Sequence, residues 1–110
     1  MGKKTVEVAP ETQKILEKMG RQIKSARVRR NLSAQEVAER IGVSRMTVSA
    51  VEKGKATVSM GTYAAVLHVL DGMDKNFTLI AKEDEISKRM EKFNFRQRAT
   101  KAPKENSSLE

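Results

Sequence analysis

Residues 33–54 read SAQEVAERIGVSRMTVSAVEKG, and this stretch predicts two short helices joined by a tight turn. Ser33 and Glu36 form an S-x-x-E pattern, in which both side chains accept hydrogen bonds from free backbone amides at a helix start. We therefore expect the first helix to begin at Ala34. It should end at Gly42, because glycine readily adopts the left-handed conformation that closes a helix.

The second helix is predicted over 45–53, because Ser44 precedes it as a candidate cap and Gly54 follows it as a stop. Two helices joined by a turn of three or four residues make a helix-turn-helix unit, whose second helix enters the major groove of DNA. We therefore interpret the stretch as a DNA-binding unit. The alternative is a small helical bundle in which these polar residues are merely solvated.

The first residues of the second helix combine arginine, methionine and hydroxyl side chains. Arginine can donate two hydrogen bonds to guanine, methionine can contact the thymine methyl group, and hydroxyls reach phosphates or bases. The candidate DNA-contacting residues of this helix and its cap are Ser44, Arg45, Met46, Thr47, Ser49 and Ala50.

The charge distribution agrees with a DNA-binding interpretation. The 110-residue chain has a net charge of +8. Residues 20–58 carry nine Lys or Arg and three acidic residues, a net charge of +6. Residues 59–85 carry two basic and five acidic residues, a net charge of −3. Residues 86–110 carry seven basic and three acidic residues, a net charge of +4. Each phosphate neutralised contributes about 0.9 to the slope of log affinity against log salt, so steep salt dependence is expected.

Composition excludes several other classes. A chain of 110 residues with four aromatic side chains can hold one small helical core plus tails. It has no cysteine, no long apolar run and no apolar signal-peptide core, so we expect a cytoplasmic chain with no membrane span. One histidine and no Gly-rich phosphate loop predict no enzyme, no metal site and no cofactor.

Two further helices are predicted on either side of this stretch. The first starts near Pro10, a tolerated first-turn residue, and runs to about Arg30, and the second spans about 60–70 with Ser59 as its cap. The core residues expected on them are Ile15, Met19, Ile23, Ala26, Tyr63, Val66, Leu67 and Leu70, with the Tyr63 hydroxyl in water.

Residues 77–81, FTLIA, form a short β-prone run after the helices. A lone strand is unstable in water, so we expect it to pair with the same strand of a second copy about a two-fold axis. A homodimer would set two recognition helices about 34 Å apart and predicts a palindromic operator. The alternative is a strand folded onto its own chain, against 5–8.

The tail from Ile86 to Glu110 is basic and too polar to form a core, so we expect it to be flexible. A short helix over 83–92 is the alternative. The run KRMEKFNFRQR mixes basic and aromatic residues that could stack on nucleic acid or dock on a protein.

Residues 19–70 also resemble the Xre/Cro-type helix-turn-helix regulators. The resemblance rests on RQIKSARVRRNLSAQEVAERIGVSRMTVSAVEKG and is strongest in I-G-V-S-R-x-T-V-S-x-V-E-x-G. It implies a mainly α, lambda-repressor-like fold of four to five helices. It also implies that an arginine of the first helix, Arg27, pairs with Glu52 as part of the scaffold.

The resemblance assigns roles to the candidate site residues. Base reading falls on Ser44, Arg45, Met46 and Ala50, and a phosphate-contacting hydroxyl falls on Thr47. The family's phosphate-binding glutamine has no exact counterpart, because Ala34 occupies its place and Gln35 follows one residue later. Lys53 and Lys55 lie where the family approaches the DNA backbone.

The segment VSMGTYAAVLHVLDGMDKNFTLIAKEDE, with its β-prone run, resembles the HipB-type antitoxins. This resemblance implies a repressor of its own operon that binds a HipA-like kinase toxin. A stand-alone Xre-family regulator and an interaction adaptor without DNA binding are the alternatives.

The expected organisation has four parts. They are an N-terminal extension over 1–10, a DNA-binding domain over 11–72 with its helix-turn-helix unit at 33–54, a dimerisation strand region over 73–85, and the flexible tail over 86–110.

Overall fold

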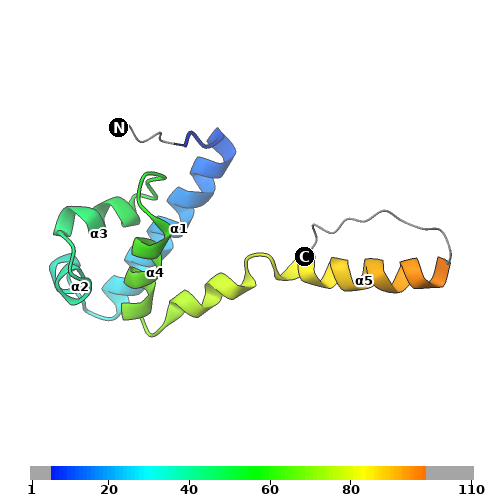
Figure 1. The fold of residues 1–110 in the computed structure, drawn as a ribbon. Helices are drawn as coiled ribbons and strands as arrows, with labels where there is room; N and C mark the ends of the chain where they lie inside the picture. Colours follow the sequence, from blue (N-terminus) through cyan, green and yellow to red (C-terminus); the bar gives the residue numbers. More distant parts are fainter. Residues whose placement is uncertain (1–5, 99–110) are drawn as a thin grey trace. The chain divides into compact units, whose positions relative to one another are not determined.

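The computed structural model describes residues 6–98, with side chains described as far as Glu91. All regular elements in this range are helical. They are α1 (Pro10–Arg29), α2 (Ala34–Ile41), α3 (Arg45–Glu52), α4 (Met60–Val69), the 3-10 helix η1 (Met73–Leu79) and α5 (Lys82–Arg98), drawn in Figure 1. The prediction of a mainly α chain is confirmed, and the bounds expected for α1 to α4 agree within one residue.

The chain divides into two compact units, Met1–Asp74 and Lys75–Glu110. The first unit contains α1 to α4. Helix α3 packs against α1, α2 and α4, and α2 also packs against α4 (Figure 1). The buried apolar core consists of Ile23, Ala26, Val37, Ala38, Val48, Val51, Tyr63, Val66, Leu67 and Leu70.

The apolar face predicted for α1 is wrong at its first residue. Ile15 is 66% exposed, whereas Leu16 is half-buried and Gly20 and Ile23 are buried. The spacing from Leu16 through Gly20 to Ile23 keeps one helical face toward the core. Ile15 lies one position out of phase with that face, so its side chain remains in solvent.

Serine residues cap α2, α3 and α4, as the sequence predicts. Ser33 Oγ accepts a hydrogen bond from the Glu36 amide at 3.0 Å, and the Glu36 carboxylate accepts one from the Ser33 amide at 2.7 Å. Ser44 and Ser59 each accept from the amide three residues on at 3.1 Å. Gly42 closes α2 with φ 76°, in the left-handed region. Local hydrogen bonding thus sets the helix ends.

Helix α1 and the end of α3 approach so closely that only glycine fits between them. A Cβ on Gly20 would lie 2.5 Å from the Glu52 carbonyl oxygen and 2.8 Å from the Gly54 amide nitrogen. A Cβ on Gly54, where φ is +71°, would meet the Leu16 backbone. The Gln13 side-chain amide donates to the Gly54 carbonyl at 3.1 Å. These backbone contacts fix the last turn of α3 on α1, a feature that the sequence analysis did not predict.

The strand predicted over 77–81 is wrong. Residues 73–79 form η1, and no strand occurs anywhere in residues 6–98. A lone β-prone run has no partner for its amides and carbonyls, so turns that pair polar groups locally are favoured. One such bond joins Thr78 Oγ1 to the Lys75 carbonyl at 2.8 Å. The expected strand pairing between two copies therefore has no structural basis in the described residues.

Much of the tail expected to be flexible is helical, because α5 extends to Arg98. The alternative of a short helix over 83–92 anticipated part of it. The amides of Asp84 and Glu85 donate to the Ala81 carbonyl at 3.1 and 3.2 Å and start the helix. Acidic residues in the first turn of α5 and basic residues later in it complement the helix dipole. This charge arrangement stabilises α5 although most of its side chains are polar.

The chain ends lie partly outside the described residues. Residues 1–5 and 99–110 are not described, and within the proposed alternative strand over 5–8 the segment 6–8 has no regular structure. Among the helices of residues 6–98, none is both long and apolar enough to cross a membrane.

Replacing Gly20 with alanine is expected to lower the free energy of unfolding by about 2 to 3 kcal/mol, because backbone must move to admit the methyl group. Gly61→Ala in α4 is the matched control, since a Cβ there meets only Ser59 Oγ, at 3.8 Å. The control should leave stability unchanged or raise it by up to about 1 kcal/mol. Urea denaturation measures both, and equal stability of the two variants would contradict the close approach.

The capping box predicts a pH dependence of stability. The hydrogen bond from the Ser33 amide holds the pKa of Glu36 below its ordinary value of 4.5. Its stabilisation is therefore present above about pH 4.5 and is lost as the pH falls through the folded-state pKa. Between pH 5 and 3, the wild-type chain should lose more stability than Glu36→Gln, which does not titrate. An NMR titration in which Glu36 ionises at or above 4.5 would exclude this role.

Candidate nucleic-acid interface

One face of α3 points away from the core and carries the predicted base-reading side chains. Val48 and Val51 are fully buried on the opposite side, while Met46 is 80% exposed. Ser44 and Arg45 are also exposed, and Thr47, Ser49 and Ala50 are half-buried. Helical spacing places Met46 near the centre of the outward face, with Arg45, Ser49 and Ala50 around it. The structure thus brings the six residues of α3 and its cap onto one short surface.

The exposed methionine is unusual among its small and polar neighbours. Met46 is the most exposed large apolar residue of the described chain. Its flexible thioether can adapt to an irregular apolar surface, such as a thymine methyl group in the major groove. Met46 is therefore exposed and available for such a contact.

Ser44 and Thr47 form a hydroxyl pair at the start of α3. Ser44 Oγ accepts a hydrogen bond from the Thr47 amide and lies 3.1 Å from Thr47 Oγ1. One hydroxyl donates to the other, which leaves one hydroxyl hydrogen to donate elsewhere. The pair therefore caps the helix and still offers a donor to a phosphate or base acceptor.

Basic side chains lie at both ends of α3. Arg45 is exposed at its start, Lys53 is exposed at its C-cap, and Lys55 is exposed just beyond. A helix of eight residues is about 12 Å long, which is close to the width of the major groove. Lys53 and Lys55 can therefore reach phosphates while Arg45 and Met46 at the start of the helix face the bases.

The loop that carries Lys55 is fixed by a tyrosine. Tyr63 is only 6% exposed, and its hydroxyl donates to the Lys55 carbonyl at 2.7 Å. Burial raises the pKa of Tyr63 above 10. The expectation of a hydroxyl in water is therefore wrong. No sequence signal identifies this bond, because its acceptor is a backbone carbonyl in an irregular loop.

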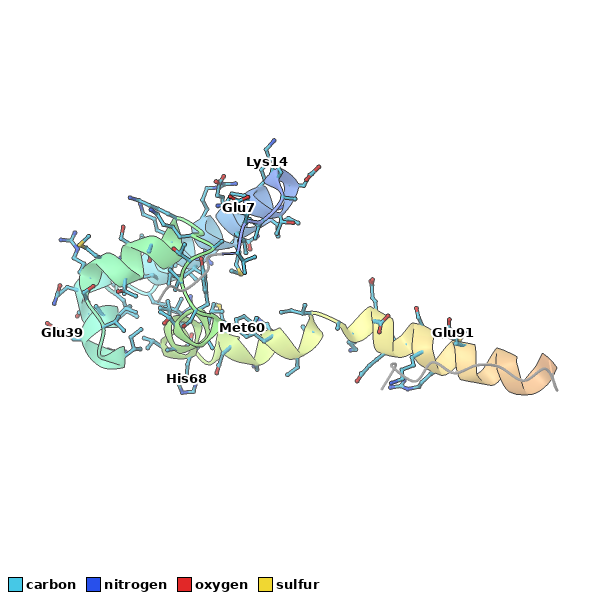
Figure 2. All side chains as sticks on the ribbon, turned by 45° about the horizontal axis from the view of Figure 1, so that its top comes forward. Glu7, Lys14, Glu39, Met60, His68 and Glu91 are labelled. Carbon is cyan, nitrogen blue, oxygen red and sulfur yellow. The ribbon has the colours of Figure 1, made fainter. Side chains whose placement is uncertain are left out.

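Gln35 is exposed on α2 but is already hydrogen-bonded. Its side-chain amide donates to Glu39 Oε2 at 3.0 Å, and Glu39 lies on the outer side of α2 (Figure 2). A phosphate contact by Gln35 has to compete with this bond and bring DNA near a carboxylate. Among the predicted contacts, its local geometry is the least favourable.

A nearly buried ion pair holds α3 in place. Arg27 Nε and Nη2 donate to the two carboxylate oxygens of Glu52 at 2.6 and 3.0 Å, and Arg27 Nη1 donates to the Leu32 carbonyl at 2.9 Å. The side chains of Arg27 and Glu52 are 12% and 8% exposed. Hydrogen bonding to Glu52 raises the pKa of Arg27. The pair implied by the resemblance is confirmed, and it has a structural role.

Comparison with known proteins agrees with this geometry. Residues 23–73 match the model of a helix-turn-helix family. The matched residues cover the last part of α1 together with α2, α3 and α4. The regular elements of residues 6–98 are all helical, which agrees with this match. Comparisons with curated proteins and with solved structures found no match to this chain.

Removing the Arg27 side chain is expected to destabilise the helix-turn-helix domain. Arg27→Ala strands the Glu52 carboxylate and should lower the free energy of unfolding by about 3 kcal/mol. Arg29→Ala is the matched control, because Arg29 is exposed and bonds only to Ser25 of the same helix, at 2.9 Å. Urea denaturation compares the two variants. Equal stability would mean that the ion pair does not hold the domain together.

Proposed function

We propose that the chain is a sequence-specific DNA-binding transcriptional repressor that reads its operator with α3. The observation that carries this proposal is the outward face of α3, where Met46 and Arg45 stand exposed on a helix whose other side is buried. A helix presented in this way can enter the major groove without rearrangement of the core.

Charge supports the same function. The helix-turn-helix stretch over 20–58 has a net charge of +6 and includes the exposed Arg45, Lys53 and Lys55. Lys53 and Lys55 at the end of the reading helix favour the phosphate backbone, while Arg45 and the residues that follow it favour base edges. A regulator of this kind would act on DNA in the cytoplasm.

We assign the contacts as follows. Arg45 reads guanine, Met46 and Ala50 contact methyl groups, and Ser44 donates to a base or phosphate. The remaining contacts, from Thr47, Ser49, Lys53, Lys55 and Gln35, go to phosphates and position the domain. We keep 11–72 as the extent of the DNA-binding domain.

Arg45→Ala is expected to weaken specific binding by about 1 to 3 kcal/mol, or roughly 5- to 150-fold, because a bidentate base contact is lost. The probe is a duplex selected from random sequence by the wild-type chain, and fluorescence anisotropy measures binding. Arg21→Ala on the exposed side of α1 is the matched control and should change affinity by less than about threefold.

Salt dependence separates the roles of the basic residues. Lys53→Ala and Lys55→Ala should each weaken all sequences alike and reduce the salt slope by about 1. If Arg45→Ala and Arg21→Ala bind the selected duplex equally well, the reading helix is wrongly assigned. If the wild-type chain selects no duplex and shows no salt-sensitive binding, the proposed function is wrong.

We further propose that the repressor is a HipB-type antitoxin that binds a HipA-like kinase toxin. The support is the sequence resemblance over 58–85 alone, since the strand expected at 77–81 is replaced by the end of η1 and a turn. A kinase-like reading frame next to this gene, whose product co-purifies with the chain, is the expected result. Absence of both favours a stand-alone regulator.

A further inference from the structure

The unit Lys75–Glu110 exposes apolar side chains that have no core of their own. Within its described side chains, none is buried. Leu79 is 54% exposed, Ile80 71%, Ile86 47% and Met90 57%. Helix α5 has 17 residues, and because most helical stability in proteins comes from packing of an apolar face, an unpaired α5 lacks that contribution.

The apolar residues of α5 share one face. Ile86 and Met90 are four residues apart and therefore lie one above the other on the helix. In the sequence, Phe93 continues the same spacing, i, i+4, i+7. This is the spacing of a seam that packs against a second helix.

The charges of α5 are divided along its length. Glu83, Asp84 and Glu85 fill the first turn, whereas residues 87–98 contain five Lys or Arg against the single acidic residue Glu91. Two copies of such a helix attract each other when antiparallel, because each acidic end meets a basic half. Parallel copies would place like charges side by side.

We propose that α5 is the dimerisation helix and pairs antiparallel with α5 of a second copy. A two-fold axis at the level of residue 88 sets Ile86 of each copy against Met90 of the other. Glu83 then lies about 6 Å along the helix axis from Arg89 of the second copy, a separation that these two long side chains can span in an ion pair.

The pairing explains why a basic, polar tail keeps an apolar seam, and it replaces the strand as the means by which two helix-turn-helix domains join in one molecule. Only one consequence of the pairing rests on the proposed function, namely that the dimer binds a palindromic operator with its two helix-turn-helix domains. A helix pair of this length forms a small interface, so we expect a dissociation constant of about micromolar order.

Sedimentation equilibrium of the full chain without DNA tests the pairing over about 1 to 200 μM, a range that brackets the expected constant. The wild-type chain should show a reversible monomer–dimer equilibrium. The double variant Ile86→Lys/Met90→Lys should be monomeric and should keep the thermal transition of the helix-turn-helix domain. Ile15→Lys is the matched control, because Ile15 is equally apolar and 66% exposed but lies on α1. This control should dimerise as the wild type does.

A charge-reversal pair tests the orientation. Glu83→Arg and Arg89→Glu should each weaken dimerisation about tenfold, and the two together should restore it, since both ion pairs then reform with opposite polarity. Restoration cannot come from the helix itself, because the arginine at 83 remains unfavourable at its N-terminus. A double variant as weak as the singles overturns the antiparallel arrangement.

A wild-type chain that stays monomeric throughout, or a dimer that survives Ile86→Lys/Met90→Lys, overturns the proposal. The proposed function is judged separately, by binding of the monomeric variant to a half-site duplex. If the half-site duplex is bound and the wild-type chain is monomeric, only the dimerisation by α5 is overturned. If the chain dimerises but binds no duplex, only the DNA-binding function is overturned.

Discussion

The ion pair between Arg27 and Glu52 is the interaction on which the candidate DNA-binding surface depends. It joins α1 to the end of α3, and the third bond, to the Leu32 carbonyl, includes the connection into α2. Such a pair adds little net stability over an apolar replacement, because desolvation offsets much of the attraction. Its geometry is directional, however, so it fixes where α3 lies. The close approach at Gly20 fixes the same turn sterically.

Support from one side leaves the other side of α3 free. Val48 and Val51 anchor the helix in the core, so Met46 and its neighbours can remain exposed without loosening the fold. Tyr63 holds the loop after α3 through the Lys55 carbonyl. The reading surface is therefore a short rigid helix with a fixed exit loop, the kind of support that lets a binding site be formed before its ligand arrives.

The helix ends and most of the core were predictable from sequence because their causes are local. Ser33, Ser44 and Ser59 cap through bonds to residues three positions away, and Gly42 closes α2 by its own backbone freedom. Contacts between distant segments were not predictable in this way. The close approach of Gly20 to the end of α3 depends on how two helices pack together. The ion pair between Arg27 and Glu52 was expected only because of the family resemblance.

The wrong strand prediction has a physical explanation. The β-prone residues at 77–81 are too few to form a sheet alone, and the acidic run from Glu83 to Glu85 is a good start for a helix. Intrinsic strand propensity is weak where no partner strand is available. This region therefore presents a helix face in place of the expected sheet edge. Dimerisation, if it occurs through this region, has to involve α5.

The most direct test of α3 as the reading helix is an NMR titration of the isotope-labelled full chain with the selected duplex. The largest amide shift changes should fall on Ser44 to Ala50 and on Lys53 and Lys55, while the buried core around Val66 changes little. Changes concentrated on α1 or α4, with α3 unaffected, would contradict the account.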